Sequence, residues 1–259
     1  MGSWEDSGEL EGFGLFREVS PIFASDELLI RDRAVVLSQV SAGSFSIGFD
    51  AVISGEVRSL LDGSLADRVT ILGDVALGGM LSGNRGGVTG VVFEEANVSY
   101  PDLPIRTVGA GGAYVEVPHD GFSSLPPGDY GNLVVRSRGT LELSAAGVYS
   151  FTSVSFEPDA LLDIAGNFDV AIAVDGDIVL GDRFEMSVAN QSTLDSNHLF
   201  LYSSGSQVRY GHDSVVVGHL EAPFAHVEIS DRSIVRGTLR ARTLTLGFDT
   251  IVGPRAAGF

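Results

Sequence analysis

The chain has 259 residues and a formal net charge of -18, from 34 acidic and 16 basic side chains, with no cysteine and no lysine. These numbers exclude disulfide bridges, thiolate metal sites and lysine Schiff-base chemistry. A field of that sign repels nucleic acid and anionic lipid, so we expect no nucleic-acid partner.

Residues 1–24 are predicted to form an N-terminal arm. The first twenty residues lack the basic start and the continuous apolar run of a secretory signal. Nowhere do eighteen apolar residues follow one another, so we expect no transmembrane segment. Four apolar side chains of the arm are candidates for a cap on the fold that follows: Trp4, Phe13, Leu15 and Phe16.

One short pattern recurs along the rest of the chain. An aliphatic or aromatic residue is followed by three mostly small or charged residues, then by a β-branched pair and often a glycine. The first three copies start 17 and 18 residues apart, and the last three start 19 and 17 residues apart. The copies begin at Ile30, Ile47, Leu65, Tyr210, Ile229 and Leu246, with a weaker copy at Leu180.

A period of 17–19 residues is too short for a helical hairpin or a propeller blade, and it fits one coil of a β-solenoid. We therefore predict an all-β fold, a single-stranded parallel β-solenoid (β-helix) of right-handed sense with an irregular insertion. A β-sandwich is the alternative, because it also has short strands between turn residues. The constant side-chain register over successive copies favours the solenoid.

Charged residues three positions after each start alternate in sign. They are Arg33, Asp50 and Arg68 in the first run, and Asp213, Arg232 and Asp249 in the second. Stacked coils lie about 4.8 Å apart, so opposite charges in one column form a ladder that fixes the register. The other interpretation is a polysaccharide-cleaving groove, and the ladder is the favoured one.

Residues 84–127 interrupt the repeat. Five of the nine prolines fall in this segment, beside the glycine-rich run 109–112. We predict an insertion or long loops here, first solenoid coils over residues 25–83, and a continuation of the same solenoid over residues 128–256.

The run 125–133, Leu-Pro-Pro-Gly-Asp-Tyr-Gly-Asn-Leu, is followed by short strand repeats at 139–143 and 146–151. In this it resembles an uncharacterised bacterial β-solenoid domain of surface and pilus-assembly-associated proteins, over roughly residues 100–256. The glycine-punctuated period is also similar to that of bactofilins, which are polymer-forming scaffold proteins. Both resemblances imply a structural role, with surface or pilus-associated partners, and neither implies catalytic residues.

Other candidate sites carry less weight. Of the five histidines, the last three, His212, His219 and His226, are spaced by seven residues and so fall on different faces of a coil, which argues against a shared metal. Asp175, Asp177 and Asp182 bracket two glycines and are more typical of turns than of a calcium loop. The chain has no Gly-x-Ser-x-Gly element, and the glycines at 109–112 lack the setting of a dinucleotide site. We predict no catalytic residue, no metal and no cofactor.

The sequence thus predicts a structural or scaffold protein that is not an enzyme and that associates with itself through the solenoid ends or the insertion. The C-terminal end is the expected contact, because repeats run to Val252 and little chain remains for a cap. A carbohydrate-binding or polysaccharide-cleaving β-helix is the alternative. A bacterial cell-surface or extracellular location is favoured over a cytoplasmic scaffold.

Overall fold

The computed structural model describes residues 21–100, 102–166, 168–188 and 198–253. Within these ranges the chain is a parallel β-solenoid, and its one described helix is the short 3-10 turn η2 (Arg85–Gly87). No described helix is long and apolar enough to span a bilayer. The predicted all-β solenoid is therefore confirmed, while the cap candidates Trp4, Phe13, Leu15 and Phe16 lie outside the described residues.

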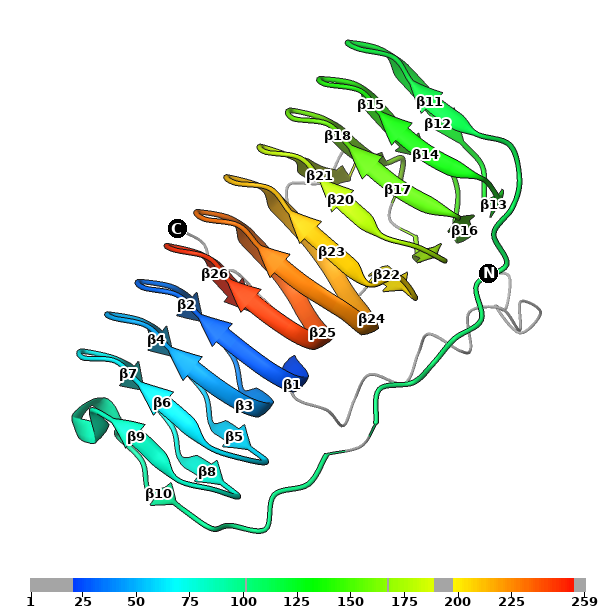
Figure 1. Ribbon diagram of the computed structural model, residues 1–259. Helices are drawn as coiled ribbons and strands as arrows, with labels where there is room; N and C mark the ends of the chain where they lie inside the picture. Colours follow the sequence, from blue (N-terminus) through cyan, green and yellow to red (C-terminus); the bar gives the residue numbers. More distant parts are fainter. Residues whose placement is uncertain (1–20, 101, 167, 189–197, 254–259) are drawn as a thin grey trace.

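The coils have three faces, each a ladder of parallel strands (Figure 1). The first face contains β12 (Phe122–Leu125), β15 (Thr140–Leu143), β18 (Leu161–Ile164), β21 (Glu185–Val188), the starts of β24 (Val215–Ile229) and β25 (Ile234–Leu246), β26 (Ile251–Gly253), β2 (Val35–Val36), β4 (Val52–Ile53) and β7 (Thr70–Ile71).

The second and third faces follow the same stacking order. The second face contains β13 (Gly128–Asp129), β16 (Gly147–Phe151), β19 (Val170–Val174), β22 (Leu199–Ser203), the middles of β24 and β25, the starts of β1 (Ile22–Ile30) and β3 (Val40–Ile47), β5 (Val57–Ser59), β8 (Val75–Leu77) and β10 (Val92–Phe93). The third face contains β11 (Val115–Val117), β14 (Asn132–Val135), β17 (Ser153–Phe156), β20 (Ile178–Leu180), β23 (Gln207–Tyr210), the ends of β24, β25, β1 and β3, β6 (Gly63–Leu65) and β9 (Leu81–Gly83).

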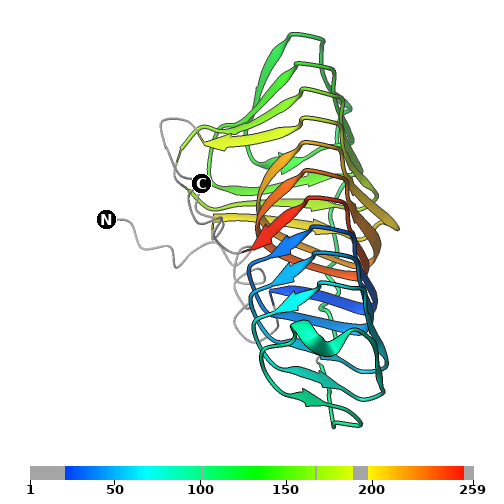
Figure 2. The same ribbon diagram turned by 90° about the vertical axis from the view of Figure 1, so that its left-hand side faces the viewer.

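The order of the coils in space differs from their order in the sequence. Strand β25 pairs with β1, and β26 pairs with β2, so the C-terminal coil stacks directly on the first coil. Figure 2 shows the red C-terminal strand next to the blue N-terminal ones in the middle of the stack. The expectation that the C-terminal end lies open for another subunit is therefore wrong, because the chain's own first coil covers it.

The two outer ends of the solenoid are the coil of β11 and β12 and the coil of β9 and β10 (Figure 1). Residues 94–100 and 102–114, which we call the strap, run between these ends along the length of the stack. The insertion expected over 84–127 is thus shorter, because β10, η2, β11 and β12 all belong to coils. Pro118 and Pro126 follow strand ends, where a missing amide hydrogen breaks no ladder.

Side chains alternate between the interior and the surface along each strand. The interior is a single cluster of aliphatic and aromatic residues that extends from coil to coil. Where a large side chain needs room, its neighbour is small: Gly63 lies beneath Phe45, and a Cβ there would come within 2.2 Å of the ring. This matched filling of neighbouring coils fixes the register of the stack.

Candidate functional site

A column of ten charged residues with left-handed backbone runs along one corner of the solenoid. Each has a φ between 55° and 64°. In stacking order they are Asp120, Arg138, Asp159, Arg183, Asp213, Arg232, Asp249, Arg33, Asp50 and Arg68. In nine of the ten, all but Arg68, the backbone amide donates to a carbonyl of the coil that follows; Arg33 N, for example, bonds to Phe49 O at 2.8 Å.

The ten residues form five bidentate ion pairs between adjacent coils. Each arginine donates from Nε and Nη2 to the two carboxylate oxygens, over 2.5–2.7 Å and 2.6–2.8 Å respectively. The hydrogen bonds from arginine lower the pKa of all five aspartates, and both partners are solvent-exposed. Because every carboxylate of the column is engaged by a guanidinium, this geometry suits a register ladder better than acid–base catalysis.

The structure brings all six predicted ladder residues together, but in one column where the sequence indicated two. The pair between Asp249 and Arg33 joins the two runs. Sequence reasoning missed Asp120, Arg138, Asp159 and Arg183, because the coils between them have unequal lengths. The sequence separation is 18 residues within the first of these pairs and 24 within the second. An Asp or Arg two residues before a strand of the first face is the signal that could have found them.

The strap covers the second face and holds a buried ionic cluster against it. Tyr202 Oη accepts a hydrogen bond from Arg106 N at 2.9 Å and donates one to Arg106 O at 3.1 Å. The Arg106 guanidinium lies 3.4 Å from Glu221, whose side chain is 2% exposed. Burial raises the pKa of Glu221, and the charge of Arg106 opposes that shift. Arg240 occupies the next rung and is also buried.

Further along the strap, Tyr100 packs edge-on against Phe23, with ring centroids 5.4 Å apart. Burial raises the pKa of Tyr100 to about 12. The second face is therefore covered on its outer side as well as its inner side, which is why Glu221 and Arg240, at outward-pointing strand positions, are shielded from solvent. Nothing in their local sequence distinguishes them from surface residues.

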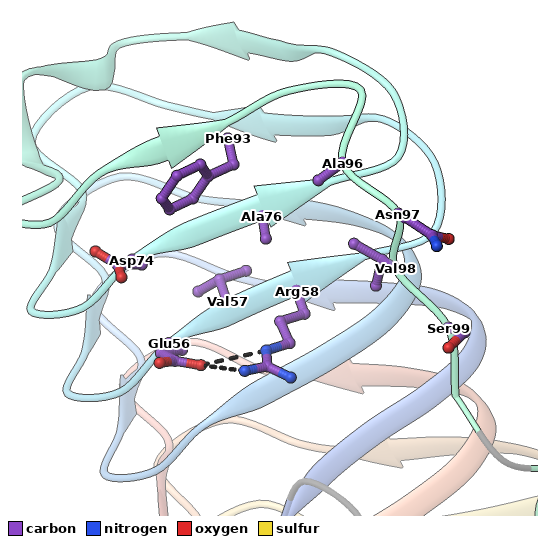
Figure 3. A pocket seen from close by; sticks show the side chains of 10 residues that line it. All are labelled: Glu56, Val57, Arg58, Asp74, Ala76, Phe93, Ala96, Asn97, Val98 and Ser99. Atoms are coloured by element: carbon purple, nitrogen blue, oxygen red, sulfur yellow. Dashed lines mark hydrogen bonds and ion pairs between the residues drawn. The ribbon is translucent and has the colours of Figure 1, made fainter.

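A hollow of about 310 Å³ remains where the strap leaves the second face. Figure 3 shows its lining: strands β5 and β8, the corner residues Glu56 and Asp74, Phe93, and the strap residues 96–99. Glu56 accepts hydrogen bonds from Arg58 Nη2 at 2.8 Å and Nε at 3.2 Å. Asp74 Oδ1 accepts one from Val91 N at 2.7 Å.

The part of the chain that the structure describes contains no group of three residues able to hold a metal ion. The histidines have separate neighbours: His119 lies near Asp120, His198 near Asp169, His212 near Asp231, His219 near Thr238 and His226 near Thr243. Asp177 and Asp182 accept hydrogen bonds from backbone amides of the next coil, as expected of turn residues.

No family model matches the chain, and no curated protein does. The resemblances to the surface and pilus-assembly-associated domain and to bactofilins therefore stay predictions. Among solved structures, the ice-binding protein of the Antarctic ascomycete Antarctomyces psychrotrophicus has a TM-score of 0.45 at 13% identity, covering 92% of this chain and 95% of that one. An ice-binding protein with antifreeze activity from an Arctic yeast has a TM-score of 0.37 at 12% identity, covering 92% and 93%. An ice-binding protein from an Antarctic biological consortium has a TM-score of 0.34 at 12% identity, covering 90% and 86%.

Proposed function

We propose that the protein is a non-catalytic structural module that forms a dimer through the open end of its solenoid. The observation that carries this proposal is the difference between the two ends of the stack. A terminal coil exposes a row of backbone donors and acceptors, which pair with another chain unless something covers them.

At the other end of the stack, two side chains cover the outer edge of β9 on the third face. Leu81 is the outermost buried residue of β9, and its amide donates to Glu94 Oε1 at 2.8 Å. Its carbonyl accepts from Arg85 Nη2 at 2.5 Å, and Arg85 and Glu94 form an ion pair of 2.6 Å with each other. These two residues satisfy the outward backbone groups of Leu81 and block strand addition there.

The end at β12 has no such cover among the described residues. Thr140 N donates to Gly121 O, and Ser144 N donates to Leu125 O. Because alternate residues of a parallel strand bond to opposite sides, Phe122 and Ser124 turn their backbone groups away from the solenoid. No described residue bonds to these groups, and the Phe122 side chain is 64% exposed.

One open end favours a closed dimer over a filament. A two-fold axis across the end would pair β12 with its own copy in antiparallel fashion and bury both Phe122 side chains. Filament growth would also need an open end at β9, which Arg85 and Glu94 cover. The Asp–Arg column would hold the coils in register in each copy.

Light scattering after size-exclusion chromatography tests the proposal. We expect wild type to show twice the mass of the chain, more completely as salt screens the net charge of -18. Ser124→Pro removes an outward amide hydrogen and Phe122→Lys adds a charge to the edge, so both should give monomers. Phe93→Lys is the control at the other end, because Phe93 is also an exposed phenylalanine (49%, against 64% for Phe122), and this variant should stay dimeric. A wild type that is monomeric at every salt concentration, or a control that dissociates equally, would refute the proposal.

A further inference from the structure

The hollow beside Phe93 arises from one small residue in an otherwise bulky column. Phe93, Ala76 and Arg58 occupy the same position in three successive coils of the second face. Adjacent rungs lie about 4.8 Å apart, so the methyl group of Ala76 leaves a gap about two rungs wide between an aromatic ring and a guanidinium. Phe93 is 49% exposed, and its ring borders this gap (Figure 3).

The rim of the hollow carries hydrogen-bonding groups of both kinds. Glu56 and Asp74 lie at the corner on one side, and Asn97 and Ser99 of the strap lie on the other. Glu56 is neutralised by Arg58, and no described residue bonds to Asp74 Oδ2. The rim therefore offers carboxylate acceptors, guanidinium donors and an amide that is both.

We propose that this hollow binds a neutral pyranose ring of a carbohydrate. The apolar C–H face of the sugar stacks on Phe93, and its hydroxyl groups donate to Glu56 and Asp74 and accept from Arg58 and Asn97. A volume of about 310 Å³ accommodates one such ring, and a few directional polar groups above an apolar floor are typical of small-molecule sites. Anionic ligands are disfavoured by the net charge of -18.

The site is independent of the proposed dimer contact. Strands β8 and β10 lie at one end of the solenoid, and β11 and β12 lie at the other (Figure 1). A variant that loses sugar binding can therefore still be tested for dimer formation, and a variant that loses the dimer can still be tested for sugar binding.

Saturation-transfer NMR and calorimetry with glucose, galactose, N-acetylglucosamine, cellotetraose and chitotetraose test the proposal. We expect saturable binding of at least one of these sugars, with a millimolar Kd for a single ring. Ala76→Leu fills the gap from an outward-facing, half-buried position, and Phe93→Ala removes the stacking face. Each should weaken binding at least tenfold. Phe122→Ala, an exposed phenylalanine at the opposite end, should change it less than twofold.

Two results would overturn the proposal. One is the absence of saturable binding of every sugar tested to wild type that circular dichroism shows to be folded. The other is unchanged affinity in both Ala76→Leu and Phe93→Ala. Light scattering on the same samples reports dimer formation separately, so a failed carbohydrate site and a failed dimer give different results.

Discussion

The stacking of the last coil on the first has a measurable energetic consequence. Leu28 is near one end of the sequence but in the middle of the solenoid, between Leu244 and Phe45, and it is fully buried. Leu28→Ala removes three buried carbon groups, worth about 2.4 kcal/mol at about 0.8 kcal/mol each. The residual cavity adds to this, so we expect the free energy of unfolding to fall by about 3–4 kcal/mol.

Leu81→Ala is the matched comparison, because Leu81 is 3% exposed but lies in an outermost coil. Its coil can open locally without the rest of the stack, so the loss in global stability should be smaller. Denaturant unfolding of both variants measures the difference.

Hydrogen exchange tests the same reasoning without substitutions. Amides of residues 22–30 should exchange only with global unfolding, while those of residues 81–93 should exchange first, as should those of residues 115–125 in the Phe122→Lys variant, which lacks the dimer contact. A larger loss of stability in Leu81→Ala than in Leu28→Ala, together with fast exchange over residues 22–30, would refute the stacking order.

Three further predictions address packing, pH and the strap. Gly63→Ala should destabilise the fold by about 1–3 kcal/mol, because its Cβ would meet the buried Phe45 ring, whereas Gly109→Ala, with no atom within 4 Å, should be neutral in thermal unfolding. The five column aspartates have folded-state pKa values below the ordinary 3.8, so their stabilisation is present above that value and is lost as the pH falls through the lower folded pKa. Circular dichroism should therefore show that wild type unfolds at acid pH. In the double variant Asp50→Asn, Asp213→Asn the dependence of stability on pH should be shallower, and an acid transition identical to that of wild type would contradict this. Glu221→Gln removes the buried carboxylate facing Arg106, so trypsin should cleave after Arg106 several-fold faster than in wild type or in the exposed control Glu185→Gln.

The sequence predicted the coil but not the order of the coils. The period, the β-branched pairs and the Asp or Arg at the turn are local features, and each is set within one coil. Which coil stacks on which is a non-local choice, because every coil offers a similar edge. The sequence did contain one signal of the order. If the C-terminal copies precede the N-terminal copies in the stack, the alternation of charge continues without a break, because Asp249 is then followed by Arg33.

The strap and its buried cluster were beyond local reasoning for a related reason. Glu221 and Arg240 occupy alternate strand positions that face solvent in an uncovered solenoid. Only the path of the strap across the second face buries them, and that path follows from where the two outer coils end. The hollow beside Phe93 likewise depends on the register of three coils. Ala76 does not stand out within its own strand, and the gap exists only because Phe93 and Arg58 stack on either side of it.

The stacking order also predicts that the chain tolerates circular permutation. Residues 115–253 and 22–93 run in the same direction along the stack, so joining Phe259 to Met1 and opening the strap gives a solenoid whose coils follow the sequence. The first and last described residues, Pro21 and Gly253, already lie near each other: Leu239 N donates to Pro21 O at 2.9 Å, and Gly253 pairs with Arg236, three residues away on β25.

A permutant that begins at Leu103 keeps both strap contacts, since Tyr100 stays with the N-terminal coils and Arg106 with β22. Its halves are joined by the 26 residues 254–259 and 1–20, against 21 in the strap, 94–114. The loop-closure cost differs by about 0.2 kcal/mol, so the free energy of unfolding should stay within about 1 kcal/mol of wild type. A permutant opened between Ser230 and Asp231, inside a central coil, interrupts the Asp–Arg column and should be far less stable. If chemical unfolding shows the reverse order, the last coil does not stack on the first.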